Sequence, residues 1–268
     1  MGYNTKIDWC DTSWNPVTGC YHGCDYCYAR GIAHRYSGYS IDPVGDSVVF
    51  RDFNSLPMIE LENQVSKVDK NRSVRVAPYP YGFTPTLHRY RLDQPTEWTQ
   101  PRTIFVCSMA DLFGEWVPYE WIKAVFDACD KAPQHRYLFL TKNPARYISL
   151  SEKGMLPSKH WYGYSATTDD DLWTFHHADD CPVKNLFVSV EPIHDRLITP
   201  FSTHCPADWV IIGAETGNCK NKIIPKRSWI TEIADHCEMM SIPVFMKESV
   251  KELMGSDFKQ QFPWEVLK

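Results

Sequence analysis

The sequence predicts an α/β fold, a full or partial barrel of parallel β/α units. From residue 103 to residue 246, short apolar runs alternate with segments whose apolar residues recur at helical spacing. Strands that alternate with helices in this way form parallel β/α units, and short strands that are apolar throughout are typical of a sheet covered on both faces. The 268 residues, 43% of them hydrophobic and 23% charged, suit a soluble globular protein of one large domain or two small ones.

The expected elements follow one another along the chain. A short first strand is expected at residues 7–9, and a short helix at residues 28–36 directly follows a cysteine-rich loop. Beyond a long connection, the pattern predicts strand 103–107, helix 119–131, strand 137–140, helix 145–152, strand 161–164, helix 169–177, strand 186–190, strand 209–213, helix 228–240 and strand 243–246. This order amounts to roughly six or seven β/α units.

Residues 37–102 have weak periodicity and many proline and glycine residues. We interpret them as a long connection with two short helices rather than a separate domain. Basic and aromatic side chains interleave within it: Lys67, Lys70, Arg72, Arg75, Arg89 and Arg91 with Tyr79, Tyr81, Phe83 and Tyr90. Such a mixture could hold a single nucleic-acid strand through phosphate contacts and stacking. The preferred interpretation is a solvated loop whose aromatic residues anchor it to the core.

Charge and cysteine content narrow the class of protein. The net charge of −5 and the pI near 6.1 give no overall nucleic-acid footprint. The N-terminus has no apolar signal core, and no run of eighteen apolar residues occurs. The ten cysteines are therefore expected to be reduced, in a cytoplasmic protein that does not span a membrane.

Three cysteines, Cys20, Cys24 and Cys27, lie within eight residues in the spacing C-x3-C-x2-C. Thiolates this close bind a metal or cluster, exchange disulfides, or reflect chance. A [4Fe–4S] cluster is usually held by four cysteine thiolates. Three thiolates would leave one iron open, as a catalytic metal site keeps a position for its substrate.

Two other interpretations of the cysteines stay open. The trio with His22 or His34 could form a Cys3His zinc site, although zinc ligands usually come as two short clusters separated by a longer span. Cys24 and Cys27 alone match the C-x-x-C redox pattern. The zinc interpretation gives the alternative function, a non-enzymatic zinc-binding protein that interacts with nucleic acid.

With Tyr26 directly before the third cysteine, the spacing resembles the signature of the radical S-adenosylmethionine (SAM) superfamily. The resemblance implies that Cys20, Cys24 and Cys27 ligate a [4Fe–4S] cluster whose open iron binds SAM. Reductive cleavage of SAM would then give a 5′-deoxyadenosyl radical that abstracts hydrogen from a substrate. The resemblance also implies an electron donor such as a flavodoxin or ferredoxin, and it counts Tyr26 among the cofactor-binding residues.

The superfamily fold is a partial barrel of about six β/α units with its cluster loop after the first strand. The resemblance therefore implies a partial (β/α)6-type barrel. In this chain it would be a single domain over residues 1–268, with residues 37–102 inserted after the first unit.

Polar residues follow several predicted strands. In parallel β/α folds, functional groups gather at the carboxyl ends of the strands. The candidates at these ends are Ser108, Asp111, Lys142, Ser165, Glu191 and Glu215. A lysine could bind a carboxylate, glutamates could bind an ammonium group or a ribose, and hydroxyls could bind the remaining polar atoms.

A more specific resemblance covers nearly the whole chain. Residues 14–20, 107–113, 140–142, 189–192 and 212–217 together look like the phage-associated radical-SAM family of unknown function. A fainter similarity runs to spore photoproduct lyases, which makes nucleic acid a candidate substrate, beside a peptide or a small metabolite.

The similarity to spore photoproduct lyases implies roles for three of the strand-end residues. By position, Ser108, Lys142 and Ser165 would contact SAM. The Gly-Gly-Glu pattern of many radical-SAM enzymes is absent after the second strand, so Ser108 or Asp111 would bind the SAM amino group. Structural alternatives are a helix cap at Ser108, a surface lysine at Lys142 and a turn at Glu191.

Overall fold

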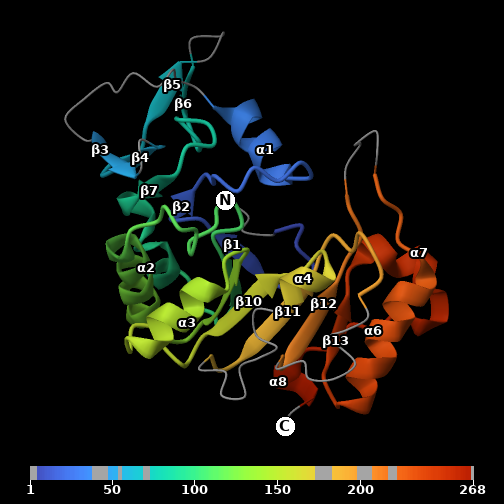
Figure 1. Ribbon diagram of the computed structural model, residues 1–268. Coiled ribbons are helices and arrows are strands. Elements are labelled where there is room, and N and C mark those ends of the chain that lie inside the picture. Colours follow the sequence, from blue (N-terminus) through green and yellow to red (C-terminus); the bar gives the residue numbers. More distant parts are fainter. Residues whose placement is uncertain are drawn as a thin grey trace. The chain divides into compact units, whose positions relative to one another are not determined.

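The structure is a computed structural model that describes residues 5–37, 48–53, 56–68, 73–172, 183–197, 207–216 and 222–266 (Figure 1). The chain divides into two compact units. The first contains Cys10–Tyr137, and the second contains Thr5–Trp9 and Leu138–Lys268. The boundary between them falls inside one strand, β9 (Arg136–Thr141).

Parallel strands form the main sheet in the order β1-β8-β9-β10-β11-β12-β13. In the first unit β1 pairs with β8, and in the second β9 to β13 each pair with the next strand, all in parallel. These strands are β1 (Thr12–Trp14), β8 (Thr103–Val106), β10 (Trp161–Ser165), β11 (Leu186–Val190), β12 (Trp209–Ile212) and β13 (Val244–Met246). Parallel strands that follow sequence order have the topology of a partial β/α barrel. The α/β fold class is therefore confirmed.

The strand positions agree with the apolar runs because these strands are buried on both faces. Every residue of β8, β11, β12 and β13 is buried. The expected strand at residues 7–9 is wrong, because those residues form a turn and the first strand is β1. Trp9 instead packs against Phe187 and Trp209 of the second unit, with ring centroids 6.1 and 6.3 Å apart. Trp9 is buried because it packs against these rings, and not because it belongs to a strand.

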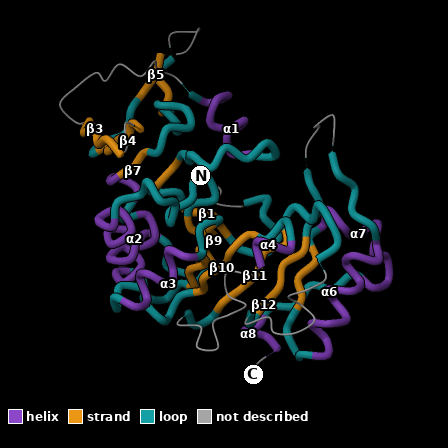
Figure 2. The backbone as a smooth tube through the Cα atoms, viewed as in Figure 1, coloured by secondary structure: helices purple, strands orange, loops and turns teal. Residues whose placement is uncertain are grey.

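Helices separate most of the parallel strands, as the periodicity predicts (Figure 2). They are α1 (Tyr28–Tyr36), α2 (Tyr119–Lys131), α3 (Ala145–Glu152), α4 (Asp169–Leu172) and α6 (Arg227–Met239), with short α7 (Lys251–Met254) and α8 (Pro263–Val266) near the C-terminus. The predicted extension of α4 to residue 177 lies outside the described residues. In the described part of the chain, no helix has the length and apolar character needed to cross a membrane.

The connection at residues 37–102 contains strands that its sequence did not reveal. A four-stranded sheet has the order β2-β7-β4-β3, and β5 pairs with β6. The strands of the connection are β3 (Val48–Phe53), β4 (Leu56–Leu61), β5 (Ser66–Val68), β6 (Val74–Val76) and β7 (Thr86–His88), and β2 (Val17–Thr18), which precedes the cysteine loop, completes the four-stranded sheet. Two short 3-10 helices follow, η1 (Arg89–Arg91) and η2 (Gln94–Glu97), and two more, η4 (Glu248–Val250) and η5 (Gly255–Asp257), lie near the C-terminus. β3 pairs with its neighbour β4 and β5 with its neighbour β6, so their shortness and not distant pairing hid them, whereas β7 pairs with the more distant β2 and β4.

The aromatic residues of the connection anchor it within the first unit. Tyr81 is buried in a cluster with Ile59 and Leu61. Tyr79 and Phe83 pack against a second cluster, formed by Ala29 and Ala33 of α1 and by Met109. This packing agrees with the preferred interpretation, in which the aromatic residues anchor the connection to the core.

Two arginines of the connection are engaged inside the same unit. Arg89 donates through Nε and Nη2 to Oε2 of the buried Glu60, whose Oε1 accepts from the indole of Trp121 at 2.8 Å. Arg91 donates to the carbonyls of Asn15 and Pro78. Lys70 and Arg72 lie outside the described residues.

Candidate functional site

The cysteine loop begins where the main chain is held on two sides. The amide of Gly19 donates to the carbonyl of Met109 at 2.9 Å, and that of Cys20 donates to the carbonyl of Phe83 at 3.2 Å. Gly19 has φ +87°, and a Cβ there would lie 2.4 Å from the carbonyl oxygen of Thr84. Only glycine tolerates both the positive φ and this close approach. The local sequence thus fixes the start of the loop through backbone atoms.

The three cysteines of the loop are free thiols, each half-buried. The Sγ of Cys20 accepts from the amide of His22 at 3.5 Å. The Sγ of Cys27 accepts from the amide of Arg30 at 3.4 Å and caps the N-terminus of α1. The positive end of a helix dipole favours negative charge on a sulfur placed there. Cys27 therefore places its sulfur at the N-terminal end of α1.

Burial raises the pKa of the Cys20 thiol to about 12, and the negative charges of Asp111, Cys24 and Cys27 raise it further, while the His22 amide lowers it. The thiol is therefore protonated at neutral pH. A bound metal must displace that proton, which couples metal affinity to pH.

The donor set has the chemistry of an iron–sulfur site. Three sulfur ligands on one loop match three of the four thiolates that usually hold a [4Fe–4S] cluster, and soft sulfur ligands also suit zinc. As the loop stands, no three His, Cys, Asp or Glu side chains in the described ranges are grouped closely enough to hold a metal ion. By donor type, the residues fit the cluster.

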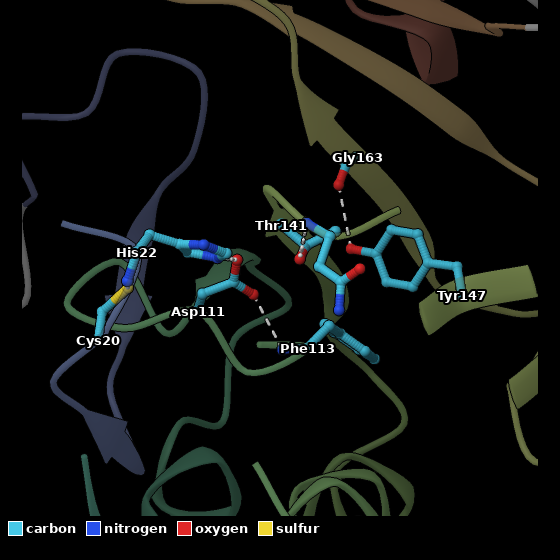
Figure 3. A network of polar contacts seen from close by, with 8 residues as sticks. Cys20, His22, Asp111, Phe113, Thr141, Tyr147 and Gly163 are labelled. Carbon is cyan, nitrogen blue, oxygen red and sulfur yellow. Dashed lines mark hydrogen bonds and ion pairs between the residues drawn. The ribbon is translucent and has the colours of Figure 1, made fainter. Parts of the chain in front are cut away.

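His22 and Asp111 tie the cysteine loop to the segment that follows β8 (Figure 3). The His22 Nε2 lies 2.7 Å from the Asp111 Oδ2, and the Asp111 Oδ1 accepts from the amide of Phe113 at 2.9 Å. The His22 ring meets Trp116 edge to face at 4.9 Å between centroids. Asp111, predicted to contact SAM, thus also positions the loop. One ring nitrogen of His22, a candidate zinc ligand, is engaged by a carboxylate.

Asn15 binds Ser108, the other predicted site residue in the segment that follows β8. Its Oδ1 accepts from the Ser108 hydroxyl at 3.2 Å and from the Met109 amide at 2.9 Å. The Tyr28 hydroxyl donates to the carbonyl of Ser108 at 2.7 Å. Tyr26, directly before the third cysteine, is half-buried. The sequence did not predict this role of Asn15, although the residue stands in the segment that leads to the cysteines.

The second unit gathers polar residues at the carboxyl ends of its strands. Ser189 of β11 pairs in register with Ser165 of β10 and with Ile211 of β12. Residues in register point to the same face, and so do residues two positions further on. Glu191 and Gly213, which follow β11 and β12, therefore continue this face.

An ion pair spans the ends of these strands. The Lys247 ammonium, directly after β13, pairs with the Glu191 Oε1. Glu215, nearly buried, accepts from the amide of Ile223 at 3.4 Å, and its Oε2 lies 3.6 Å from the His194 Nε2.

The ten predicted site residues thus fall into two sets. The first unit contains Cys20, Cys24, Tyr26, Cys27, Ser108 and Asp111, and the second contains Lys142 directly after β9, Ser165, Glu191 and Glu215. The sequence analysis did not count Lys247 or Ser189 among the candidate residues. The signal that could have found them is a polar residue directly after an apolar strand, for Lys247, or inside one, for Ser189.

The fold and the cysteine loop define an α/β protein with a candidate iron–sulfur site. The chain belongs to the family described as "Protein of unknown function (DUF5131)", which matches residues 4–256. No curated protein matches the chain. Among solved structures, it is similar to that of a single-site mutant of spore photoproduct lyase at 11% identity and a TM-score of 0.46, over 97% of this chain and 79% of the other. With a TM-score below 0.5, neither the site nor the activity of that enzyme is carried over.

Proposed function

We propose that this chain is a radical SAM enzyme in which Cys20, Cys24 and Cys27 ligate a [4Fe–4S] cluster. One observation carries the proposal: the C-x3-C-x2-C spacing lies on a loop whose three thiols are all free. The loop starts at a backbone position that requires glycine, and its third cysteine caps a helix. When bound, the cluster supplies an electron that cleaves SAM reductively, and the resulting radical abstracts hydrogen from the substrate.

The residues around the loop would hold and orient these groups. His22 and Asp111 restrain the loop from one side, while Asn15 orders the segment that carries Ser108. The proposed SAM contacts are Tyr26, Ser108, Asp111, Lys142, Ser165, Glu191 and Glu215. Their hydroxyl, carboxylate and ammonium groups match the ribose and amino-acid parts of SAM.

The proposed partners are an electron donor, such as a flavodoxin or ferredoxin, and a substrate. Nucleic acid is the substrate class to test first. Arg75 is exposed on β6, as a basic group that contacts a phosphate backbone must be.

Anaerobic reconstitution with iron and sulfide tests the proposal. The wild-type chain should turn brown, absorb near 400 nm, bind about four irons and convert SAM to 5′-deoxyadenosine and methionine. Cys24→Ala should lose both the cluster and SAM cleavage. Cys10→Ala, at a half-buried thiol outside the motif, should keep both. SAM cleavage retained by Cys24→Ala would contradict the proposal, and a colourless protein with about one zinc would favour the zinc-binding alternative.

A further inference from the structure

The Glu191–Lys247 ion pair differs from the other lysine–carboxylate pairs of the second unit. The side chains of Lys247 and Glu191 are 16% and 25% exposed, whereas those of the Lys259–Glu238 pair are 38% and 69% exposed. The half-buried pair also lies at the carboxyl ends of parallel strands, where α/β proteins bind their ligands. The position and the burial of this pair both suggest that it belongs to a ligand-binding site.

Gly213 lies between the two charged side chains. A Cβ on this residue would lie 2.9 Å from the Lys247 Cδ and 3.3 Å from the Glu191 Cγ and Cδ. The amide of Gly213 donates to the carbonyl of Val190, and the amide of Lys247 donates to that of Ile212, so regular ladder bonds continue past the assigned strand ends. The residues that carry the pair are therefore held by main-chain hydrogen bonds. Gly213, which follows β12 between them, places no side chain against the pair.

Two further polar groups lie on this face. The Ser189 hydroxyl is buried and has no hydrogen-bond partner among the described residues. Buried polar atoms are normally paired with protein, water or ligand. Glu215, two residues after Gly213, adds a second carboxylate against the single Lys247 ammonium. The cluster thus offers one cationic group, two anionic groups and a hydroxyl.

We propose that Glu191 and Lys247 form a binding site for an α-amino-acid zwitterion, whose carboxylate binds Lys247 and whose ammonium binds Glu191. Such a ligand replaces one internal ion pair by two and adds no net charge. The cost of removing Lys247 and Glu191 from water is already met in the protein without ligand. A simple anion or cation would instead leave Glu191 or Lys247 without its partner.

Two ligands carry this chemistry: the amino-acid end of SAM and the amino-acid end of a substrate. The inference rests on the proposed function only for the first source, since Glu191 is among the proposed SAM contacts. Lys247 is not among those contacts, so its role adds to the proposed function.

Calorimetric titration of the full chain with two matched pairs of probes tests the inference. S-adenosylhomocysteine carries the zwitterion and 5′-methylthioadenosine lacks it, and L-methionine is compared with N-acetyl-L-methionine in the same way. In each pair that binds, we expect the zwitterion to bind at least about tenfold more tightly. Because L-methionine is also the amino-acid end of SAM, competition separates the two sources. L-methionine binding that S-adenosylhomocysteine displaces assigns the site to SAM, and L-methionine binding that persists beside bound S-adenosylhomocysteine assigns it to an amino-acid substrate.

Variants connect the preference to the ion pair. Lys247→Met and Glu191→Gln should abolish it, Lys247→Arg should retain part of it, and Lys259→Met should leave it unchanged. Gly213→Ala crowds the pair without removing charge and should weaken zwitterion binding several-fold, a second test if Lys247→Met does not fold. No preference in the wild type, or a preference that survives Lys247→Met, overturns the inference.

The failure of this inference and that of the proposed function are distinguishable. Titrating the Cys24→Ala variant separates them, because the ion pair does not need the cluster. If the proposed function alone fails, the wild type cleaves no SAM but the zwitterion preference persists. If the inference alone fails, SAM is cleaved by a protein that shows no such preference.

Discussion

The cysteine loop and the Glu191–Lys247 pair are two candidate sites built in different ways. The thiols of the first lie within eight consecutive residues, and backbone contacts at Gly19 and Cys20 hold the loop. The second joins side chains 56 residues apart, which only strand register brings together. A site of the first kind can be read from spacing. A site of the second kind needs the sheet.

Gly19→Ala should produce the largest effect, because it attacks the backbone contact that starts the cysteine loop. The new Cβ would meet the Thr84 carbonyl at a position with positive φ, so we expect a loss of about 3 kcal/mol in unfolding free energy. Urea denaturation measures this loss, and iron content after reconstitution should fall with it. Gly23→Ala is the matched control, since φ is +74° but nothing lies within 4 Å of its Cβ. It should cost about 1 kcal/mol, and equal losses for the two variants would refute the role of the Thr84 contact.

Asp111→Asn should have an intermediate effect on the same loop. The buried Asp111 carboxylate bonds to His22, so its replacement should cost about 1–2 kcal/mol. Amide hydrogen exchange should become faster in residues 19–27, while exchange in β11 to β13 stays the same. Asp25→Asn, at an exposed position of the loop, should change stability by less than about 0.5 kcal/mol. Unchanged exchange in Asp111→Asn would mean that the backbone contacts alone hold the loop.

The smallest expected effect is the loss of stability in acid that comes from Asp171. This residue lies in the second unit, and its hydrogen-bond partners are only three and four positions away in the sequence. Burial of Asp171 disfavours its charge, but hydrogen bonds from Thr167 and Thr168 outweigh this and hold its pKa below the usual value. Its contribution to stability is therefore complete above the aspartate pKa of the unfolded chain, about 3.9. It is lost as the pH falls through the lower folded pKa.

Thermal unfolding of the wild type and Asp171→Asn as a function of pH measures this contribution. The half-buried carboxylate should contribute less than about 1 kcal/mol. The difference in stability between the two proteins should shrink below about pH 4. A difference that grows as the pH falls would have the wrong sign for this explanation.

The fold was predictable wherever burial on both faces leaves a continuous apolar run. Strands β8 to β13 were placed within one or two residues for this reason, and helix α2 was placed by the helical spacing of its buried residues. Strands β5 and β6 were not, because residues 73–76 are exposed and their sequence resembles a loop. Trp9 was assigned to a strand because a buried aromatic residue gives the same local signal in a strand and in a turn.

The candidate sites were predictable to different degrees because only contacts between residues close in the sequence leave a local pattern. Spacing alone picked out the three cysteines. The contacts of Asp111 with His22 and of Ser108 with Asn15 join residues 89 and 93 positions apart, and no local pattern encodes them. The pairing of Lys247 with Glu191 follows from the register of three strands, so the sequence showed only that both residues follow apolar runs.

Trp9 sets a limit on how this chain can be divided. Residues 5–9 belong to the second unit although the first unit separates them from the rest of it in the sequence. A fragment that starts at Leu138 would leave the rings of Phe187 and Trp209 without the indole that packs on them. We therefore expect the second unit to need residues 5–9 when it is expressed alone, added in trans or joined to the fragment by circular permutation.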